Sequence, residues 1–213
     1  MNYADFRKMV LRLPVISSKD ILFFERKRQS IRNQLNRWQD RGLVVKLRRG
    51  MYILNENDRK VNPSRQFIAN QLYAPSYVSL EYALNLYGLI PERVTEVTNV
   101  STRKTVTFKN ALGVFVYQHI KPAAFSGFKA ARDEAGLSFF IALPEKAVVD
   151  FLYLNINKME PSDTAIFGAS YRFQNTESLS RAKIMKMATL FGNEKLTRLA
   201  GSFCQFIKNE RKS

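Results

Sequence analysis

The segment from Arg28 to Tyr52 constrains the fold more than any other part of this 213-residue chain. Within it, Ile31, Leu35 and Trp38 recur at i, i+4 and i+7, which places three apolar side chains in one stripe of an α-helix. Gly42 then supplies the left-handed residue that commonly ends a helix. The segment therefore begins with an amphipathic helix that buries one narrow face.

A basic β-hairpin is predicted directly after this helix. Residues 43–48 alternate as LVVKLR, with Leu43, Val45 and Leu47 on one face, which is typical of a half-buried strand. Arg49-Gly50 provides a tight turn, and residues 51–54 return as the partner strand. The hairpin is expected to hold its basic side chains beside the helix.

Two shorter helices are predicted ahead of this unit. Apolar side chains follow helical spacing until Pro14 closes the first segment, at Tyr3, Phe6, Val10 and Leu13. Ser17 and Asp20 resemble a capping box, with Asp in place of the usual Glu, for a helix over about residues 18–24. Helix, capped helix, basic helix and basic hairpin is the order of parts in a winged helix-turn-helix domain, which we assign to residues 1–60.

The polar face of the basic helix has the chemistry needed to bind duplex DNA. Asn and Gln side chains can bond adenine edges bidentately, and Arg can do the same with guanine. A basic helix on its own is more often an ordinary solvated face, so the order of parts decides in favour of DNA. The residues expected to contact DNA are Arg28, Gln29, Arg32, Asn33, Asn36, Arg37, Lys46, Arg48 and Arg49.

The distribution of charge agrees with this interpretation. Residues 1–60 contain fifteen Lys and Arg and six Asp and Glu, so 15 − 6 = +9. Residues 61–213 contain nineteen and twelve, so 19 − 12 = +7 over a segment more than twice as long. The formal charge of +16 attracts polyanions, and its density is highest where the basic helix is predicted.

The rest of the chain predicts a second, mixed α+β domain over residues 61–213, after a polar connection at 55–64. It is expected to contain a small antiparallel sheet and C-terminal helices. Helices are expected to start near Pro63 or Ser64, at Ser79 and at Pro144, where Glu145 and Lys146 are interpreted as helix-terminus charges. Strands are expected at 94–100, 105–108, 114–120 and 137–143, and final helices at 179–191 and 193–208.

A second basic surface is predicted at Arg103, Lys104 and Lys109. Arg103 and Lys104 lie between Thr102 and Thr105, where they could extend the phosphate-contacting surface or meet an acidic partner. The alternative is that they are ordinary exposed charges at a strand turn.

The sequence predicts neither an enzyme nor a metal or cofactor site. His119 is the only histidine and lies in a strand pattern, and Cys204 is the only cysteine, so a zinc cluster of the usual kind is not expected. Phosphate-binding and nucleophile-elbow motifs are missing. Glu25 and Glu210 each precede a lysine by two residues but lack the clustered carboxylates of a magnesium site.

The expected location is the cytoplasm, without a membrane partner. A lone cysteine indicates a reducing compartment, and no apolar run approaches the length of a membrane span. The protein is expected to be a monomer or a weak dimer.

Four separated motifs resemble AbiEi-type antitoxins of type IV toxin–antitoxin systems. They are LRRGMY at 47–52, YVSLEYALNLYGLIP at 77–91, VSTRKT at 100–105 and LPEKA at 143–147. The resemblance runs from about residue 5 to residue 155, and the region after Asn155 matches only loosely.

The resemblance implies a transcriptional autorepressor that binds double-stranded operator DNA through residues 28–37 and 46–49. It also implies a C-terminal domain that counteracts a nucleotidyltransferase-like toxin without forming a stable complex with it. The residues leave a second hypothesis open, a winged-helix regulator whose C-terminal domain senses a small ligand. A ligand sensor should contain a sizeable apolar pocket, whereas an antitoxin domain should present a basic or apolar outer surface.

Overall fold

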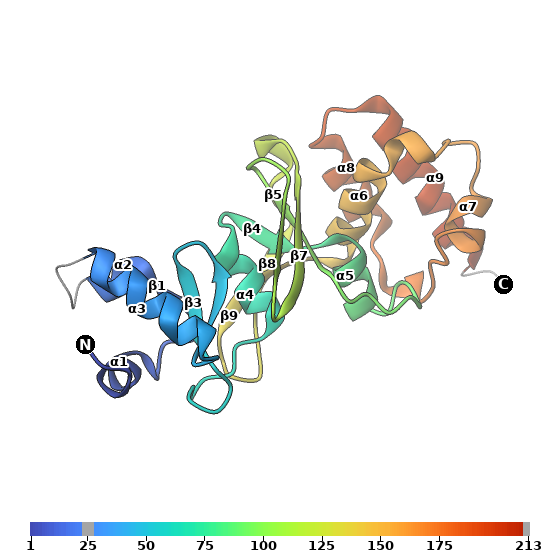
Figure 1. Cartoon of the computed structure of the whole chain (residues 1–213). Helices are drawn as coiled ribbons and strands as arrows, with labels where there is room; N and C mark the ends of the chain where they lie inside the picture. Colours follow the sequence, from blue (N-terminus) through green and yellow to red (C-terminus); the bar gives the residue numbers. More distant parts are fainter. Residues whose placement is uncertain (23–27, 211–213) are drawn as a thin grey trace.

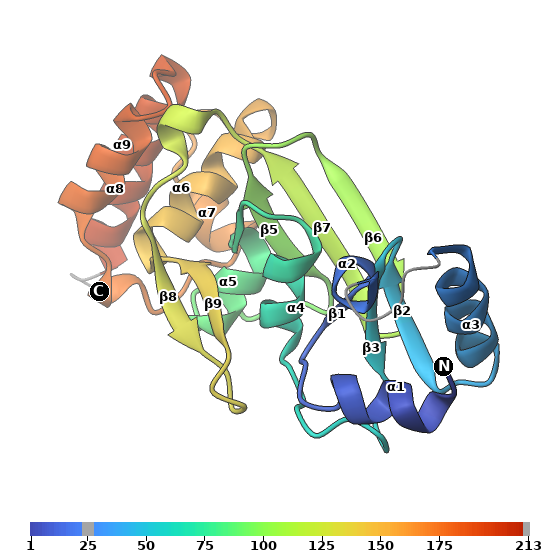
Figure 2. The same ribbon diagram turned by 90° about the vertical axis from the view of Figure 1, so that its left-hand side faces the viewer.

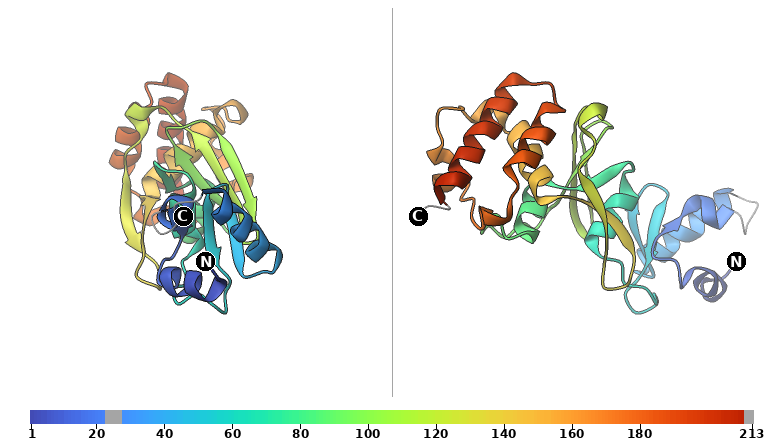
Figure 3. Two further views of the ribbon diagram at one scale, coloured as in Figure 1. Left: turned by 60° about the vertical axis from the view of Figure 1, so that its left-hand side comes forward. Right: turned by 180° about the vertical axis from the view of Figure 1, so that it is seen from behind.

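Two β-sheets, one small and one large, organise the chain, with helices against both (Figure 1). The computed structural model describes residues 1–22 and 28–210, apart from the side chains of residues 19, 22 and 28–30. The described part is α+β, as the sequence predicts. The small sheet and the first helices lie at one end of the molecule, and the C-terminal helices lie at the other (Figures 1 and 3).

The N-terminal part contains three helices and a small antiparallel sheet. Its elements are α1 (Tyr3–Val10), β1 (Ile16–Ser17), α2 (Ser18–Leu22), α3 (Arg28–Asp40), β2 (Val44–Arg48) and β3 (Met51–Leu54). The strand order is β1-β3-β2, and both pairings are antiparallel. The prediction missed β1, and the predicted end of α2 at Phe24 lies outside the described residues.

One hydrophobic cluster holds the three helices on the small sheet. It includes the predicted stripe of α3, Ile31, Leu35 and Trp38, all of which are buried. The Trp38 ring stacks on Phe6 of α1, with 4.6 Å between the ring centroids. Leu13 was predicted on the buried face of the first helix, but α1 ends at Val10 and the Leu13 side chain is exposed.

The small sheet is covered on both faces, because β2 and β3 also pack on the large core. Val44 and Tyr52 belong to the helix-side cluster, whereas Leu47, Met51 and Ile53 belong to the core of the large sheet. The prediction that β2 is half-buried is therefore wrong for Val44. A domain boundary at residue 60 stays a prediction.

The large sheet has six strands and is mixed. Its strands are β4 (Ser76–Val78), β5 (Val97–Ser101), β6 (Val106–Asn110), β7 (Gly113–His119), β8 (Phe128–Arg132) and β9 (Ser138–Ala142), in the order β6-β7-β5-β4-β9-β8. The β4–β9 and β5–β7 pairs are parallel. The prediction of a small antiparallel sheet in this part of the chain is therefore wrong, because the sheet is mixed and has six strands. Sequence reasoning missed β4, which has three residues, and β8, whose segment FKAAR lacks polar–apolar alternation.

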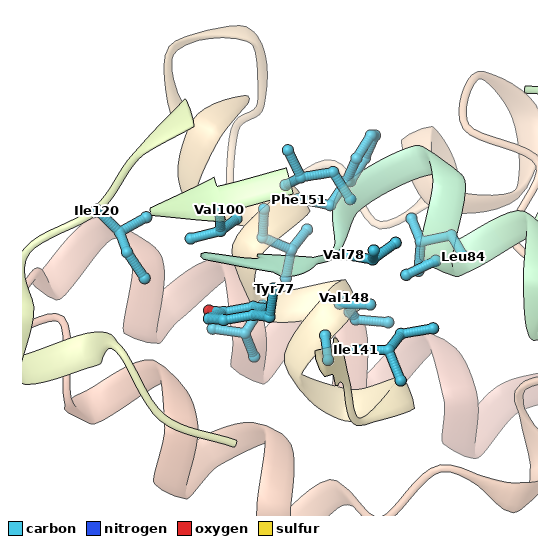
Figure 4. Packing of buried hydrophobic residues seen from close by; sticks show 14 of the residues in the cluster. Tyr77, Val78, Leu84, Val100, Ile120, Ile141, Val148 and Phe151 are labelled. Carbon is cyan, nitrogen blue, oxygen red and sulfur yellow. The ribbon is translucent and has the colours of Figure 1, made fainter. Parts of the chain in front are cut away.

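Helices cover both faces of the large sheet (Figure 2). On one side lies α4 (Arg65–Leu72), and on the other lie α5 (Leu80–Leu86) and α6 (Pro144–Leu154). Beyond α6 follow α7 (Ala165–Ala169), α8 (Arg181–Thr189) and α9 (Glu194–Glu210), and short 3-10 helices span Pro122–Ala124, Ile156–Lys158 and Thr176–Ser178. Figure 4 shows Val148 and Phe151 of α6 among the side chains of the strands. None of the described helices is both long and apolar enough to cross a membrane.

A cluster of buried polar groups joins α6 to β4. Lys146 and Asp150 are 1% and 0% exposed, and the Lys146 Nζ lies 2.5 Å from the Asp150 Oδ1. The Asp150 Oδ2 accepts hydrogen bonds from the hydroxyls of Tyr77 at 2.9 Å and Ser79 at 2.8 Å. Burial raises the pKa of Asp150, and the Lys146 charge opposes that rise.

Two predictions at the helix starts are corrected by this cluster. Ser79 was expected to cap a helix, but its side chain makes no cap hydrogen bond and donates to Asp150 instead. Lys146 was interpreted as a helix-terminus charge, but it is buried because the large sheet and the C-terminal helices enclose α6. Glu145 is buried too, and it accepts a hydrogen bond from the Ser180 backbone N–H.

Candidate nucleic-acid interface

A groove of about 650 Å³ lies between α3 and the β2–β3 hairpin. Its buried lining residues are Ile31, Leu35 and Tyr52, and its exposed lining residues are Arg32, Asn33, Asn36, Lys46 and Arg49. Five of the nine residues predicted to contact DNA therefore line one groove, although they come from two separate elements.

The apolar stripe sets the orientation of α3. Because Ile31, Leu35 and Trp38 pack on α1 and the small sheet, the helix cannot turn about its axis without exposing them. Asn33 and Asn36 are exposed as a result. Arg32 and Arg37 are exposed as well, but Arg37 does not line the groove. The side chains of Arg28 and Gln29 lie outside the described part of the chain.

The tip of the hairpin is tied to the start of α2. The Ser18 backbone N–H donates to the Gly50 carbonyl at 2.9 Å. Gly50 has a φ of +77°, which favours glycine, and a Cβ there would lie 3.0 Å from the Ser18 Oγ. This contact holds Arg49, the other residue of the turn, at the groove.

Arg48, which the sequence predicts beside Lys46 and Arg49, lies outside the groove. It is half-buried, its Nε is buried without a hydrogen-bond partner among the described residues, and it does not line the groove. Its charge acts on Tyr117 of the large sheet, where burial raises the tyrosine pKa and Arg48 opposes the rise. The pairing of β2 with β3 shifts register between Lys46 and Arg48, which breaks the simple alternation that placed the two side chains together in the sequence interpretation.

The three residues of the predicted second basic surface, Arg103, Lys104 and Lys109, do not line one hollow. Arg103 and Lys104 line a hollow of about 570 Å³ together with Tyr73, Thr102, Thr105 and His119. The guanidinium of Arg103 lies 4.1 Å from the centre of the Tyr73 ring and donates to the Ala74 carbonyl. Lys109 is exposed near the other end of β6 and does not line this hollow.

Sequence reasoning missed Ser18, Gly50 and Tyr52 as groove residues. The capping pattern does indicate a helix start at Ser18, and there the Ser17 backbone N–H donates to the Asp20 carboxylate at 2.9 Å. What the pattern does not show is that this helix start touches the hairpin tip.

Among the residues that the structure describes, no three His, Cys, Asp or Glu side chains lie close enough together to hold a metal ion. His119 is exposed, with its Nδ1 3.1 Å from the Arg103 carbonyl oxygen. Cys204 is half-buried and free.

Comparison with known proteins adds no family assignment. No model of a protein family matches the chain, and no curated protein was found to be similar to it.

Proposed function

We propose that this protein binds double-stranded DNA sequence-specifically, with α3 as the recognition helix and the β2–β3 hairpin as the wing of a winged helix. The observation that supports the proposal most is the groove, because amide and cationic side chains from α3 and from the hairpin converge there. A major groove about 12 Å wide admits an α-helix, and Asn side chains can pair with adenine edges in it.

The two elements divide the work between them. Asn33 and Asn36 on the exposed face of α3 read base edges, because an amide offers a donor and an acceptor side by side. Arg32, Lys46 and Arg49 neutralise phosphates and thereby fix the position of α3 on the duplex.

We further propose that the protein is a transcriptional autorepressor and the antitoxin of a type IV toxin–antitoxin system, opposing a nucleotidyltransferase-like toxin. This part of the proposal rests on the four sequence motifs. A nucleotidyltransferase gene beside the coding sequence, and rescue of growth when both genes are expressed, would support it. A toxic neighbour that this protein fails to counteract would refute it.

The ligand-sensor hypothesis receives less support. The hollow of about 560 Å³ between α5, the large sheet and the end of α6 is lined by charges of both signs, at Glu81, Arg93, Glu96 and Lys158. A small-molecule site is usually an apolar pocket with few polar groups.

A gel-shift series on a duplex selected from a random pool tests the division of work. Asn33→Ala should lose about 1 to 3 kcal/mol of binding to the selected duplex and far less to random DNA, because it removes a base contact. Arg49→Ala should weaken both and reduce the slope of log K against log salt by about 0.9, the value for one phosphate contact.

Two exposed residues outside the groove provide matched controls. Gln39→Ala on α3 removes an amide, as Asn33→Ala does, and Arg12→Ala after α1 removes a positive charge, as Arg49→Ala does. Each control should leave both the selectivity for the selected duplex and the slope of log K against log salt unchanged. Equal loss on selected and random duplexes for Asn33→Ala would refute the reading role.

A further inference from the structure

The outer edge of β8 pairs with no other strand in the part of the chain that the structure describes. β8 is the last strand of the large sheet and pairs only with β9 (Figure 2). Among the described residues, no backbone hydrogen bond outside the β8–β9 ladder involves Phe128–Arg132. Every second N–H and C=O of β8 is therefore available to another strand.

An apolar surface lies beside this edge. Phe140 of β9 is 48% exposed, and its register partner on β8 is Ala130, which is also exposed. The Phe140 ring packs edge-on against Phe128, with centroids 5.5 Å apart, and Phe128 in turn stacks on Tyr77. The apolar surface is thus continuous with the core and ends abruptly at the edge of the sheet.

We propose that a second copy of this chain pairs with β8 edge to edge, antiparallel about a two-fold axis at Ala130, and joins the two large sheets into one. In this register, Ala130 faces Ala130 of the second copy, Lys129 faces Ala131, and Phe128 faces Arg132. No like charges lie directly opposite each other, and the arrangement is the same for both copies. The β8 segment is complementary to itself in this register, which is centred on the strand.

The side chains on the Phe140 face also fit this pairing. Because Ala130 is small, the two central positions leave room for a Phe140 ring from each side. One apolar strip then crosses the joined sheets, and each copy contributes Phe140 and Ala130 to it. Pairing would cover the half-exposed aromatic surface, which stabilises the dimer by removing apolar area from water.

Net charge gives the dimer a characteristic salt dependence. Each copy carries a formal charge of +16, so two copies repel each other, and salt screens that repulsion. Self-association should therefore strengthen as salt rises, whereas binding to DNA weakens. The opposite trends separate this inference from the proposed function, on which it does not depend.

Sedimentation equilibrium of the full chain, freed of nucleic acid, tests the dimer from low salt to about 1 M, where the Debye length is about 3 Å. A dimer that strengthens with salt is expected. A chain that stays monomeric at every salt concentration overturns the proposal.

Substitutions on the two-fold axis test the register. Ala130→Lys places two positive charges opposite each other and should raise the dimer dissociation constant about fivefold. An equimolar mixture with Ala130→Glu should restore a dimer that contains one copy of each, because the axis brings the new charges together. Energy transfer between differently labelled variants detects this mixed dimer.

The matched control is Ala111→Lys, at an exposed alanine in the turn after β6. It adds the same charge away from β8 and should leave self-association unchanged. Because Ala130 is exposed, its variants should keep the thermal midpoint of the wild type at dilutions where both are monomeric. Folded Ala130→Lys protein that associates like the wild type, or a mixture without preference for the mixed dimer, overturns the proposed register.

Discussion

Replacing Lys146 with Met should destabilise the protein strongly at neutral pH, although α6 lies far from the groove between α3 and the β2–β3 hairpin (Figure 1). Met has nearly the same length, so it keeps the packing of the aliphatic stem beside Gly127 and Phe191. What it removes is the positive charge 2.5 Å from the Asp150 Oδ1. Removing one partner of a buried pair costs about 3 to 5 kcal/mol, because the remaining charge has lost its counter-ion.

The geometry places the expected loss near the lower end of that range. The other oxygen of Asp150 still accepts hydrogen bonds from Tyr77 and Ser79, so the carboxylate is not left without partners. We expect a loss of about 3 kcal/mol in the free energy of unfolding, measured by urea denaturation at neutral pH.

The loss should depend on pH in a defined direction. Burial raises the pKa of Asp150, and replacing Lys146 removes the positive charge that opposes that rise. A carboxyl whose pKa is raised in the folded state contributes stability below its unfolded pKa and loses it as the pH rises through the folded pKa. The deficit of Lys146→Met relative to wild type should therefore shrink as the pH falls from neutral toward about 4, near the unfolded pKa of aspartate.

Lys183→Met is the matched control. Lys183 lies 3.6 Å from Glu145 but is 59% exposed, so its loss should cost only about 0 to 1 kcal/mol. A Lys146→Met variant that loses no more stability than this control, or whose deficit is the same at every pH, would refute the reasoning.

Two further substitutions test the packing of α3 on α1 and the start of β7, where Gly113 lies against Arg65 of α4. Trp38→Ala should cost about 3 to 5 kcal/mol of unfolding free energy in urea, because Trp38 is 6% exposed and stacks on Phe6; a fully stable variant that fails to bind DNA would mean that α3 is oriented wrongly. Gly113→Ala should lower the thermal midpoint, since the φ of +126° disfavours other residues and a Cβ would displace the Arg65 guanidinium from its hydrogen bond to the Thr95 carbonyl. Gly136→Ala, where φ is +76° and a Cβ meets open space, should cost less, and equal shifts for the two would mean that displacing Arg65 costs nothing.

The sequence predicts well those features of the fold that depend on residues a few positions apart, such as helix faces and helix starts. The stripe on α3 is buried as expected because helical periodicity alone decides which side chains share a face. The helix expected to start near Pro63 or Ser64 is α4, and its start is set locally, because the Ser64 hydroxyl accepts a hydrogen bond from the Phe67 backbone N–H three residues on. The exposure of Asn33 and Asn36 on the opposite face of α3 follows from the same periodicity.

Features that arise between distant segments could not be predicted in this way. Lys146 sits in an ordinary helix start, and only the fold brings the sheet and α8 around it. Similarly, Arg48 differs from Lys46 because a register shift in the hairpin breaks strict alternation. The position of α4 and α6 on opposite faces of one mixed sheet depends on strand order, which is not encoded in any short pattern.

The two-sided cover of the small sheet has a practical consequence for experiments on the first sixty residues. A fragment that ends there would leave Leu47, Met51 and Ile53 facing water, since their packing partners belong to the large core. We expect such a fragment to aggregate or to melt early, even though its three helices keep their own cluster. The proposed DNA binding should therefore be measured on the whole chain, because the packing of β2 and β3 on the large core also holds α3 in position.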